Sequence, residues 1–326
     1  MLLTCAAIWL LAAAAATLVV QPMVAPLPSS APPVDPARLE QHVRTLSVDL
    51  YPRSFDQFAH LNQAARYIEE QFQAAGADVS VQYVTVQEAR YKNVIARFGP
   101  RTGPVMVIGA HYDSAGTETA PVVTGETHTP GADDNASGVA GLIELARLLG
   151  RQAPSRSIEL VAYTLEEPPH FRTDHMGSAW HARALRKEGR EVSLMLSLEM
   201  IGYFSDAAGS QSYPLPGMTL LYPDRGNFIA LVGRFGGFAA SRRAKAIMRG
   251  ATDLPVASLN APPGLPGVDF SDHRNYWRAG YPALMVTDTA FMRNPHYHRA
   301  GDTADTLDYV RAAKVVQAVY ALTHQF

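Results

Sequence analysis

The chain of 326 residues contains one cysteine, Cys5, and this scarcity excludes several kinds of chemistry. Cys5 lies inside an apolar N-terminal run, so a mature form without that run would contain no cysteine at all. Such a form has no disulfide, no thiolate metal ligand and no cysteine nucleophile. Any metal must then be held by histidine and carboxylate side chains, which is the ligand set of catalytic rather than structural zinc.

An excess of positive charge is also missing. Lys and Arg number 28 against 30 for Asp and Glu, the formal net charge is −2, and charged residues make up 18% of the chain. No basic stripe marks a nucleic-acid interface, so we expect no nucleic-acid partner. Hydrophobic residues make up 47%, which is enough to bury a large core in one big domain or two modest ones.

Charged side chains are absent altogether from Leu2 to Val20. An apolar run of this length suits the core of a signal peptide or a short transmembrane anchor. We expect residues 1–20 to direct export to the periplasm or the extracellular space. The usual Lys or Arg is missing at the start, so a cleaved signal and a membrane tether through residues 2–20 both stay open. Residues 21–36 are rich in Pro, Ala and Ser and are predicted to be a linker, followed by a single domain over 37–326.

Strands alternate with helices along this domain. Strands are predicted at residues 79–86, 93–98, 105–109, 157–165, 192–200, 218–221 and 282–287. Helices are predicted at residues 35–47, 56–75, 138–149, 177–186, 227–238, 242–248 and 306–322, the first with Asp35 as its cap and Pro36 in its first turn. This order favours a three-layer α/β/α sandwich around a mostly parallel, mixed central sheet.

Histidines and carboxylates gather where the predicted strands end. Three strands end in Gly-Ala-His-Tyr-Asp (109–113), Thr-Leu-Glu-Glu (164–167) and Ser-Leu-Glu-Met (197–200). Two more clusters are Gly-Ala-Asp-Asp-Asn-Ala-Ser-Gly (131–138) and the His-rich segment 294–303. Sites of open α/β sheets lie at the carboxyl ends of strands. Crowded carboxylates raise one another's pKa unless a cation lies among them, so these clusters favour a divalent metal.

With these motifs in this order, the sequence resembles the zinc exopeptidases of the M28 type, the group of aminopeptidase Y and the bacterial leucyl aminopeptidases. The resemblance covers roughly residues 111–308. The matching motifs are His-Tyr-Asp-Ser (111–114), the 131–138 motif, Glu-Glu (166–167), Leu-Glu-Met-Ile-Gly (198–202), Ser-Asp-His (271–273), Gly-Tyr-Pro (280–282) and Tyr-His-x-x-x-Asp-Thr (297–303). It implies a peptide substrate, an aminopeptidase reaction and two Zn²⁺ ions with a water between them as the nucleophile.

The resemblance also assigns roles to individual residues. The implied metal ligands are His111, Asp134, Glu167, Glu199 and His298. Asp134 would bridge the two ions, with His111 and Glu199 on one and Glu167 and His298 on the other. Glu166 would act as the general base and later protonate the leaving amine. The peptide bond between Asp134 and Asn135 is implied to be cis.

Three further residues receive supporting roles. Asp113 would orient His111 through its second ring nitrogen, and Asp302 would support the ligands from behind. Tyr297 would hydrogen-bond the developing oxyanion, with a simply packed aromatic ring as the alternative. For Asp272 and His273 two roles stay open, lining the site or forming a helix cap.

The sequence departs from the family pattern at three places. Glu199 stands where many members have aspartate, and carboxylate-rich sites accept Co²⁺ or Mn²⁺ as well as Zn²⁺. The stretches 115–130 and 168–176 are long and are expected to wall the substrate cleft. His128, His170 and His175 lie in them and are interpreted mainly as loop residues, with metal contact as the lesser alternative.

Other functions remain open beside the aminopeptidase. A glutaminyl cyclase-like acyltransferase with a single zinc would leave His111 idle. A carboxypeptidase or a deacylase is possible on the same fold, because loops select which end of a substrate fits. A catalytically dead binding protein is disfavoured, since every implied ligand and Glu166 are present. The sequence does not indicate an oligomeric state.

Overall fold

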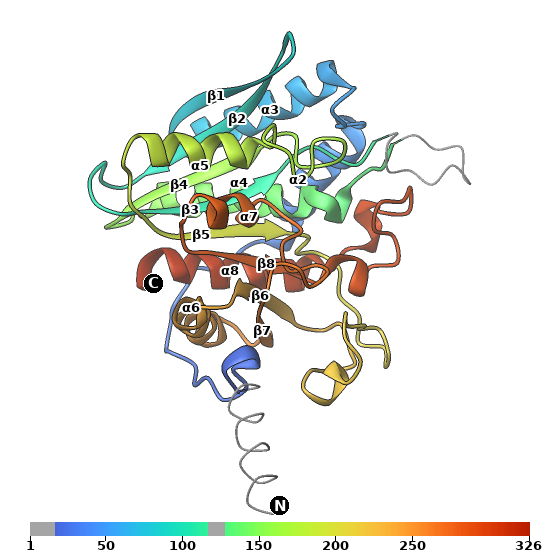
Figure 1. Ribbon diagram of the computed structural model, residues 1–326. Coiled ribbons are helices and arrows are strands. Elements are labelled where there is room, and N and C mark those ends of the chain that lie inside the picture. Colours follow the sequence, from blue (N-terminus) through green and yellow to red (C-terminus); the bar gives the residue numbers. More distant parts are fainter. Residues whose placement is uncertain (1–16, 117–127) are drawn as a thin grey trace, which may run out of the picture.

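The computed structural model describes residues 17–116 and 128–326 (Figure 1). The described residues form one sheet of eight strands in the order β1-β2-β4-β3-β5-β8-β6-β7. The strands are β1 (Asp78–Val86), β2 (Ala89–Phe98), β3 (Val105–His111), β4 (Ser157–Tyr163), β5 (Val192–Glu199), β6 (Ile229–Arg234), β7 (Val256–Ala261) and β8 (Ala283–Thr287). The pairs β4–β3, β3–β5, β5–β8 and β6–β7 are parallel, and the other three are antiparallel. The predicted mixed, mostly parallel sheet is confirmed.

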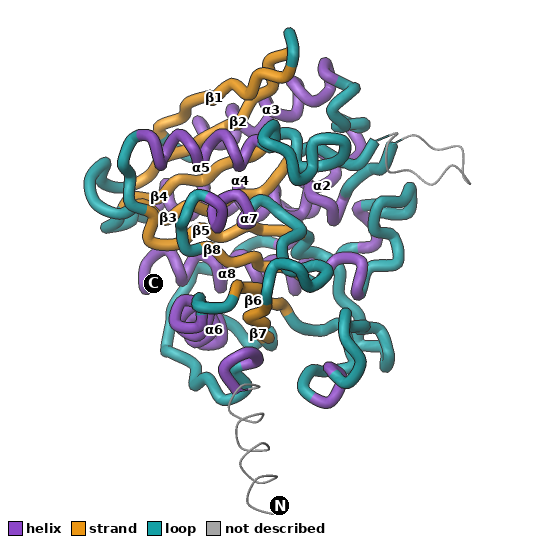
Figure 2. Tube along the Cα trace, in the orientation of Figure 1, coloured by secondary structure: helices purple, strands orange, loops and turns teal. Residues whose placement is uncertain are grey.

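Helices cover both faces of this sheet (Figure 2). They are α2 (Pro36–Arg44), α3 (Phe58–Ala74), α4 (Gly138–Arg151), α5 (Gly177–Lys187), α6 (Phe238–Ala251), α7 (His273–Arg278) and α8 (Tyr309–Gln325). Buried side chains of α2, α3, α4, α6 and α8 share one apolar core, whereas α5 and α7 share a second core with the opposite face. These layers confirm the predicted α/β/α sandwich.

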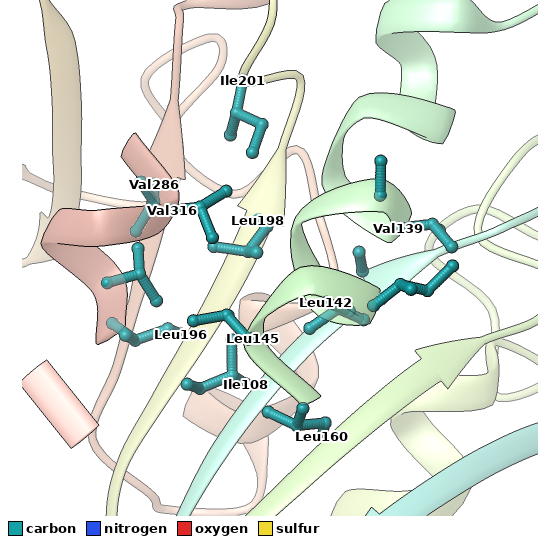
Figure 3. Close-up of a cluster of buried hydrophobic side chains, with 14 of the residues drawn as sticks. Ile108, Val139, Leu142, Leu145, Leu160, Leu196, Leu198, Ile201, Val286 and Val316 are labelled. Carbon is teal, nitrogen blue, oxygen red and sulfur yellow. The ribbon is translucent and has the colours of Figure 1, made fainter. Parts of the chain in front are cut away.

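The larger core is dense where α4 crosses the central strands (Figure 3). Leu142 and Leu145 of α4 pack with Ile108 of β3 and Leu196 of β5, and all four side chains are fully buried. Central strands are buried on both faces, which is why most of their residues are apolar. This packing fixes the strand ends where the polar clusters follow.

The region between β5 and β8 corrects two predictions. The predicted strand at 218–221 is a short 3₁₀ turn, Met218–Leu220, on the surface. The predicted helix at 227–238 is strand β6, and β7 and α7 were not predicted. A short apolar run fits a buried strand and a buried helix equally well by periodicity, and here its pairing with β7 and β8 decides for the strand.

The N-terminal predictions fall partly outside the described residues. The predicted signal or anchor of residues 1–20 is described only from Thr17, and residues 117–127 of the predicted cleft loop are likewise outside the description. The predicted linker runs along α6, where the backbone N–H of Leu27 donates to the carbonyl of Ala246 at 2.8 Å. In the described ranges, no helix combines the length and apolarity needed to cross a membrane.

Candidate metal centre

The five predicted metal ligands lie together at one edge of the sheet. His111 is the last residue of β3 and Glu199 the last of β5. Glu167 lies shortly after β4, and His298 lies in the loop after β8. These four strands are neighbours and parallel, so their carboxyl ends meet at the same edge. Asp134 reaches this edge from the turn that precedes α4.

The ligand atoms form two groups that share one residue. His111, Asp134 and Glu199 form one group and Asp134, Glu167 and His298 the other, with the atoms of each group within 4.8 Å of one another. One carboxylate oxygen of Asp134 lies 3.3 Å from Nε2 of His111, and the other lies 3.2 Å from Nε2 of His298. The Asp134 carboxylate therefore lies between the two groups, with one oxygen toward each.

These groups have the character of a cation site. Nε2 of His111 and Oε1 of Glu167 are buried without a hydrogen-bond partner in the described part of the chain. Burial raises the pKa of Glu167 to about 7, because its charged form is poorly solvated here. Two imidazole nitrogens and three carboxylates are donors that suit zinc, and a bound cation would satisfy the buried atoms.

The turn that carries Asp134 is tied to the neighbouring elements. The peptide bond between Asp134 and Asn135 is cis, as predicted. The Asp302 carboxylate accepts hydrogen bonds from the backbone N–H groups of Asp133 and Asp134 at 2.9 and 3.1 Å. Asn135 donates to the carbonyl of Leu198 and accepts from the backbone N–H of Met200, both beside Glu199. The turn that carries Asp134 is thus fixed to the end of β5.

Glu166 lies next to both groups and belongs to neither. Its Oε2 is 3.8 Å from Nε2 of His111, and the residue is 6% exposed. The preceding residue, Leu165, has φ 60°, a left-handed conformation that is uncommon for a side chain of this size. Burial, together with the charges of Glu199 and Glu167, raises the pKa of Glu166 well above its ordinary value. A carboxyl group with these properties is suited to accepting and releasing a proton.

Asp113 faces the second ring nitrogen of His111 with its backbone carbonyl and with one carboxylate oxygen. Nδ1 of His111 lies 3.1 Å from the backbone carbonyl of Asp113 and 3.6 Å from its carboxylate. The other carboxylate oxygen, Oδ2, accepts from the backbone N–H of Glu167 at 2.9 Å. Asp113 therefore lies against the second ring nitrogen of His111 and, through Oδ2, joins the end of β3 to Glu167.

Tyr297 lines an apolar pocket beside the ligand groups. Its ring stacks on His298 with the centroids 3.9 Å apart. Glu199 contributes to the wall of this pocket. Most of its other walls are apolar, including Tyr213, Met218, Phe228, Phe270, Met285 and Phe291.

Several residues left open by the sequence lie outside the two groups. His128 contacts Oγ of Ser54 at 2.8 Å, and His170 packs edge-on against Phe55 and His175. Asp272 precedes α7, but its side chain makes no capping hydrogen bond. Its carboxyl group is fully buried, which raises its pKa to about 7.

Other supporting residues were not predicted. Ser271 donates to Oε2 of Glu199 at 2.6 Å, and its hydroxyl also contacts that of Ser197 at 2.7 Å. Arg53 is fully buried and donates to the carbonyls of Tyr112 and Gly131, beside His111 and the Asp134 turn. Ser271 belongs to the Ser-Asp-His motif (271–273), which the sequence analysis had identified, whereas no recognised motif contains Arg53.

Comparison with known proteins identifies the family. The model of peptidase family M28 matches residues 93–323, so the chain belongs to this metallopeptidase family. An uncharacterised protein of Escherichia coli, YfbL, is 52% identical over 304 residues, covering 93% of this chain and 92% of YfbL. Leucine aminopeptidase 1 of Coccidioides posadasii is 27% identical over 262 residues, which are 76% of this chain but only 60% of that protein.

Solved structures share the fold. LapA aminopeptidase of Legionella pneumophila superposes with a TM-score of 0.68 at 19% identity, covering 89% of this chain and 71% of LapA. A glutaminyl cyclase of Bacteroides thetaiotaomicron superposes with a TM-score of 0.70 at 18% identity, covering 91% of this chain and 100% of the cyclase. At these identities the similarity establishes the zinc exopeptidase fold, which hosts both reactions.

Proposed function

We propose that this protein is a two-zinc aminopeptidase that releases N-terminal residues from peptides. The observation that carries the proposal is the pair of ligand groups that share Asp134, with Glu166 beside both and in neither. Relatives named leucine aminopeptidase support the choice of reaction.

His111, Asp134 and Glu199 would hold one ion and Asp134, Glu167 and His298 the other. When bound, two zinc ions lower the pKa of a water between them and polarise the scissile carbonyl. Asn135, Asp302 and Ser271 keep the ligand side chains in place, so little reorganisation is needed.

Glu166 moves the proton in this proposal. Its Oε2 takes a proton from the attacking water as the new C–O bond forms. The same oxygen then gives that proton to the amine nitrogen as the C–N bond breaks, which returns Glu166 to its starting state. The raised pKa of Glu166 suits both steps, because the group must accept and release a proton near neutral pH.

The apolar pocket would receive the side chain of the released residue. Its walls are largely aliphatic and aromatic, so an N-terminal Leu, Met or Phe suits it better than a charged residue. Tyr297 lines this pocket and would donate a hydrogen bond from its hydroxyl to the carbonyl oxygen.

The alternative is a cyclase reaction with one zinc, which the shared fold permits. That reaction leaves His111 without a metal. Here Nε2 of His111 is buried, lacks a hydrogen-bond partner in the described chain and faces Asp134 and Glu199 at 3.3 and 3.5 Å. This arrangement favours the two-metal reaction.

Mass spectrometry of two peptides, one beginning with Leu and one with Gln, tests the proposal. With zinc-loaded protein we expect stepwise loss of N-terminal residues from the Leu peptide, and a chelator should stop it. Loss of ammonia from the Gln peptide alone would replace the proposal with a cyclase. Trimming from the C-terminus would make the protein a carboxypeptidase.

We also propose that the protein acts outside the cytoplasm, because residues 2–20 lack any charge. Cell fractionation of the full chain should place the activity in the periplasm, the medium or the membrane. Recovery of active protein only from the cytoplasm would contradict export.

A further inference from the structure

Exposed apolar side chains are concentrated at one end of the molecule. In the described chain, eight large apolar residues are more than half exposed. Six of them lie on three segments: residues 17–34, residues 213–222, and residues 235–251, which include α6. These six, here called the docking face, are Leu18, Met23, Leu215, Leu220, Leu221 and Phe235. Met23 and Leu220 are the most exposed, at 87% and 88%. Apolar clustering of this kind marks an interaction surface.

The three segments are joined by hydrogen bonds around β7, which is the last strand of the sheet. Ser258 of β7 donates from Oγ to the carbonyl of Val20 at 2.9 Å, and its own carbonyl accepts from the hydroxyl of Tyr222 at 2.8 Å. Gln21 donates to the carbonyl of Phe238 at 2.8 Å, and the ring of Phe238 lies 6.2 Å from that of Phe235. Figure 1 shows the first described residues, coloured blue, near β7 and α6 at the same end of the molecule.

The N-terminal segment is fixed to this end rather than free. Nζ of Lys245 is buried and donates to the carbonyls of Val20 and Gln21 at 3.2 and 2.8 Å. Arg249 donates to the carbonyl of Val24. The segment from Val20 to Val24 therefore lies against α6.

The charge of the three segments narrows the choice of partner. They contain three exposed cations, Arg242, Arg243 and Arg249, and one buried cation, Lys245, but no acidic residue. Arg249 donates to the carbonyl of Val24 and so lies close to Met23. Apolar side chains with cations nearby fit the interface of a bilayer with anionic headgroups.

We propose that the docking face rests on an anionic lipid bilayer, with Leu220 and Leu221 inserted among the lipids. All of its residues lie beyond position 16, so the contact does not depend on whether the preceding sequence is retained. Tyr213 and Met218 of the same loop line the apolar pocket, so the bilayer would lie beside the pocket wall. The proposal is independent of the reaction that the metal centre performs.

Site-specific fluorescence in the full chain tests this contact. Cys5→Ser removes the native thiol, and an environment-sensitive label is attached to Leu220→Cys. The matched control is Tyr83→Cys on β1, an exposed aromatic position at the opposite edge of the sheet. In vesicles of phosphatidylcholine and phosphatidylglycerol, we expect the label at 220 to shift to shorter wavelength and to be quenched several-fold by brominated acyl chains. The label at 83 should stay open to aqueous iodide.

Three outcomes would overturn the proposal. Equal iodide quenching at positions 220 and 83 would show that the face does not touch lipid. Shielding of position 220 without vesicles, rising with protein concentration, would make the face a contact between two copies. Unchanged lipid quenching after Arg242→Glu would contradict a contact that depends on anionic lipid.

Discussion

Glu166 and Glu167 are adjacent in the chain but lie in different surroundings. Oε2 of Glu167 is 3.2 Å from His298, and its backbone N–H is held by Asp113. Oε2 of Glu166 is 3.8 Å from His111, and Glu166 belongs to neither ligand group. Glu167 thus lies within a group of possible ligands and Glu166 lies beside it, which is the arrangement that the two proposed roles require.

Because of this difference, replacing glutamate with glutamine should have different effects at the two adjacent positions. Glu166→Gln should lower kcat by roughly 100- to 10,000-fold while leaving the metal content unchanged, because only proton transfer is removed. Glu167→Gln should lower the metal content itself. Peptidase assays paired with elemental analysis distinguish the two, and loss of metal from Glu166→Gln would mean that base and ligand are assigned the wrong way round.

Ser271 illustrates how a residue outside the ligand set can tune the centre. Its hydroxyl donates to Glu199, the ligand whose longer side chain departs from the family pattern. An extra methylene gives Glu199 more freedom than aspartate, and this hydrogen bond restricts it.

We therefore expect Ser271→Ala to weaken metal affinity by roughly 10- to 100-fold without unfolding the protein. Ser193→Ala is a matched control, because Ser193 lies on the same strand at the opposite end from Glu199. Zinc titration with a competing chelator measures both variants. Equal affinities of Ser271→Ala and the wild-type protein would show that the hydrogen bond does not position Glu199.

At the scale of elements, a buried ion cluster joins β2, β4 and α5. Glu159 of β4 lies 3.0 Å from Arg97 of β2 and 3.2 Å from His181 of α5. Burial alone would raise the pKa of Glu159, but His181 and Arg97 outweigh it and lower the pKa from 4.5 to about 2. A lowered pKa means that the cluster stabilises the fold fully above pH 4.5 and loses this effect as the pH falls toward 2.

The shift corresponds to about 3 kcal/mol of unfolding free energy at neutral pH. Glu159→Gln should therefore cost about this much at pH 7 and clearly less at pH 3, where the wild-type carboxylate is losing its advantage. Urea unfolding of both proteins in zinc-free buffer measures the difference at each pH. A cost independent of pH would show that packing, and not charge, makes Glu159 important.

The elements also show what a sequence can predict. Strands β3, β4 and β5 are mostly apolar and are followed directly by polar motifs, so both the strands and the polar clusters after them were predictable. The strand β6 was mistaken for a helix, since only its pairing with β7 and β8 distinguishes the two. Arg53 supports the turn at Gly131 from far along the chain, a contact that no local pattern contains.

At the scale of the whole molecule, the candidate metal centre and the docking face lie at different parts of the sheet. The carboxyl ends of the central strands gather the candidate metal centre, as parallel pairing requires. The edge at β7 holds the N-terminal segment and the docking face. The apolar pocket lies between them, with Glu199 and Met218 both in its walls.

The central claim is that two metal ions share Asp134 and leave Glu166 free. Crystals of zinc-loaded wild-type protein, measured on both sides of the zinc absorption edge, test it directly. We predict two anomalous peaks, one on each side of the Asp134 carboxylate, with Glu166 bound to neither ion. A single peak at Glu167 and His298 with His111 unbound, or a peak ligated by Glu166, would contradict the account.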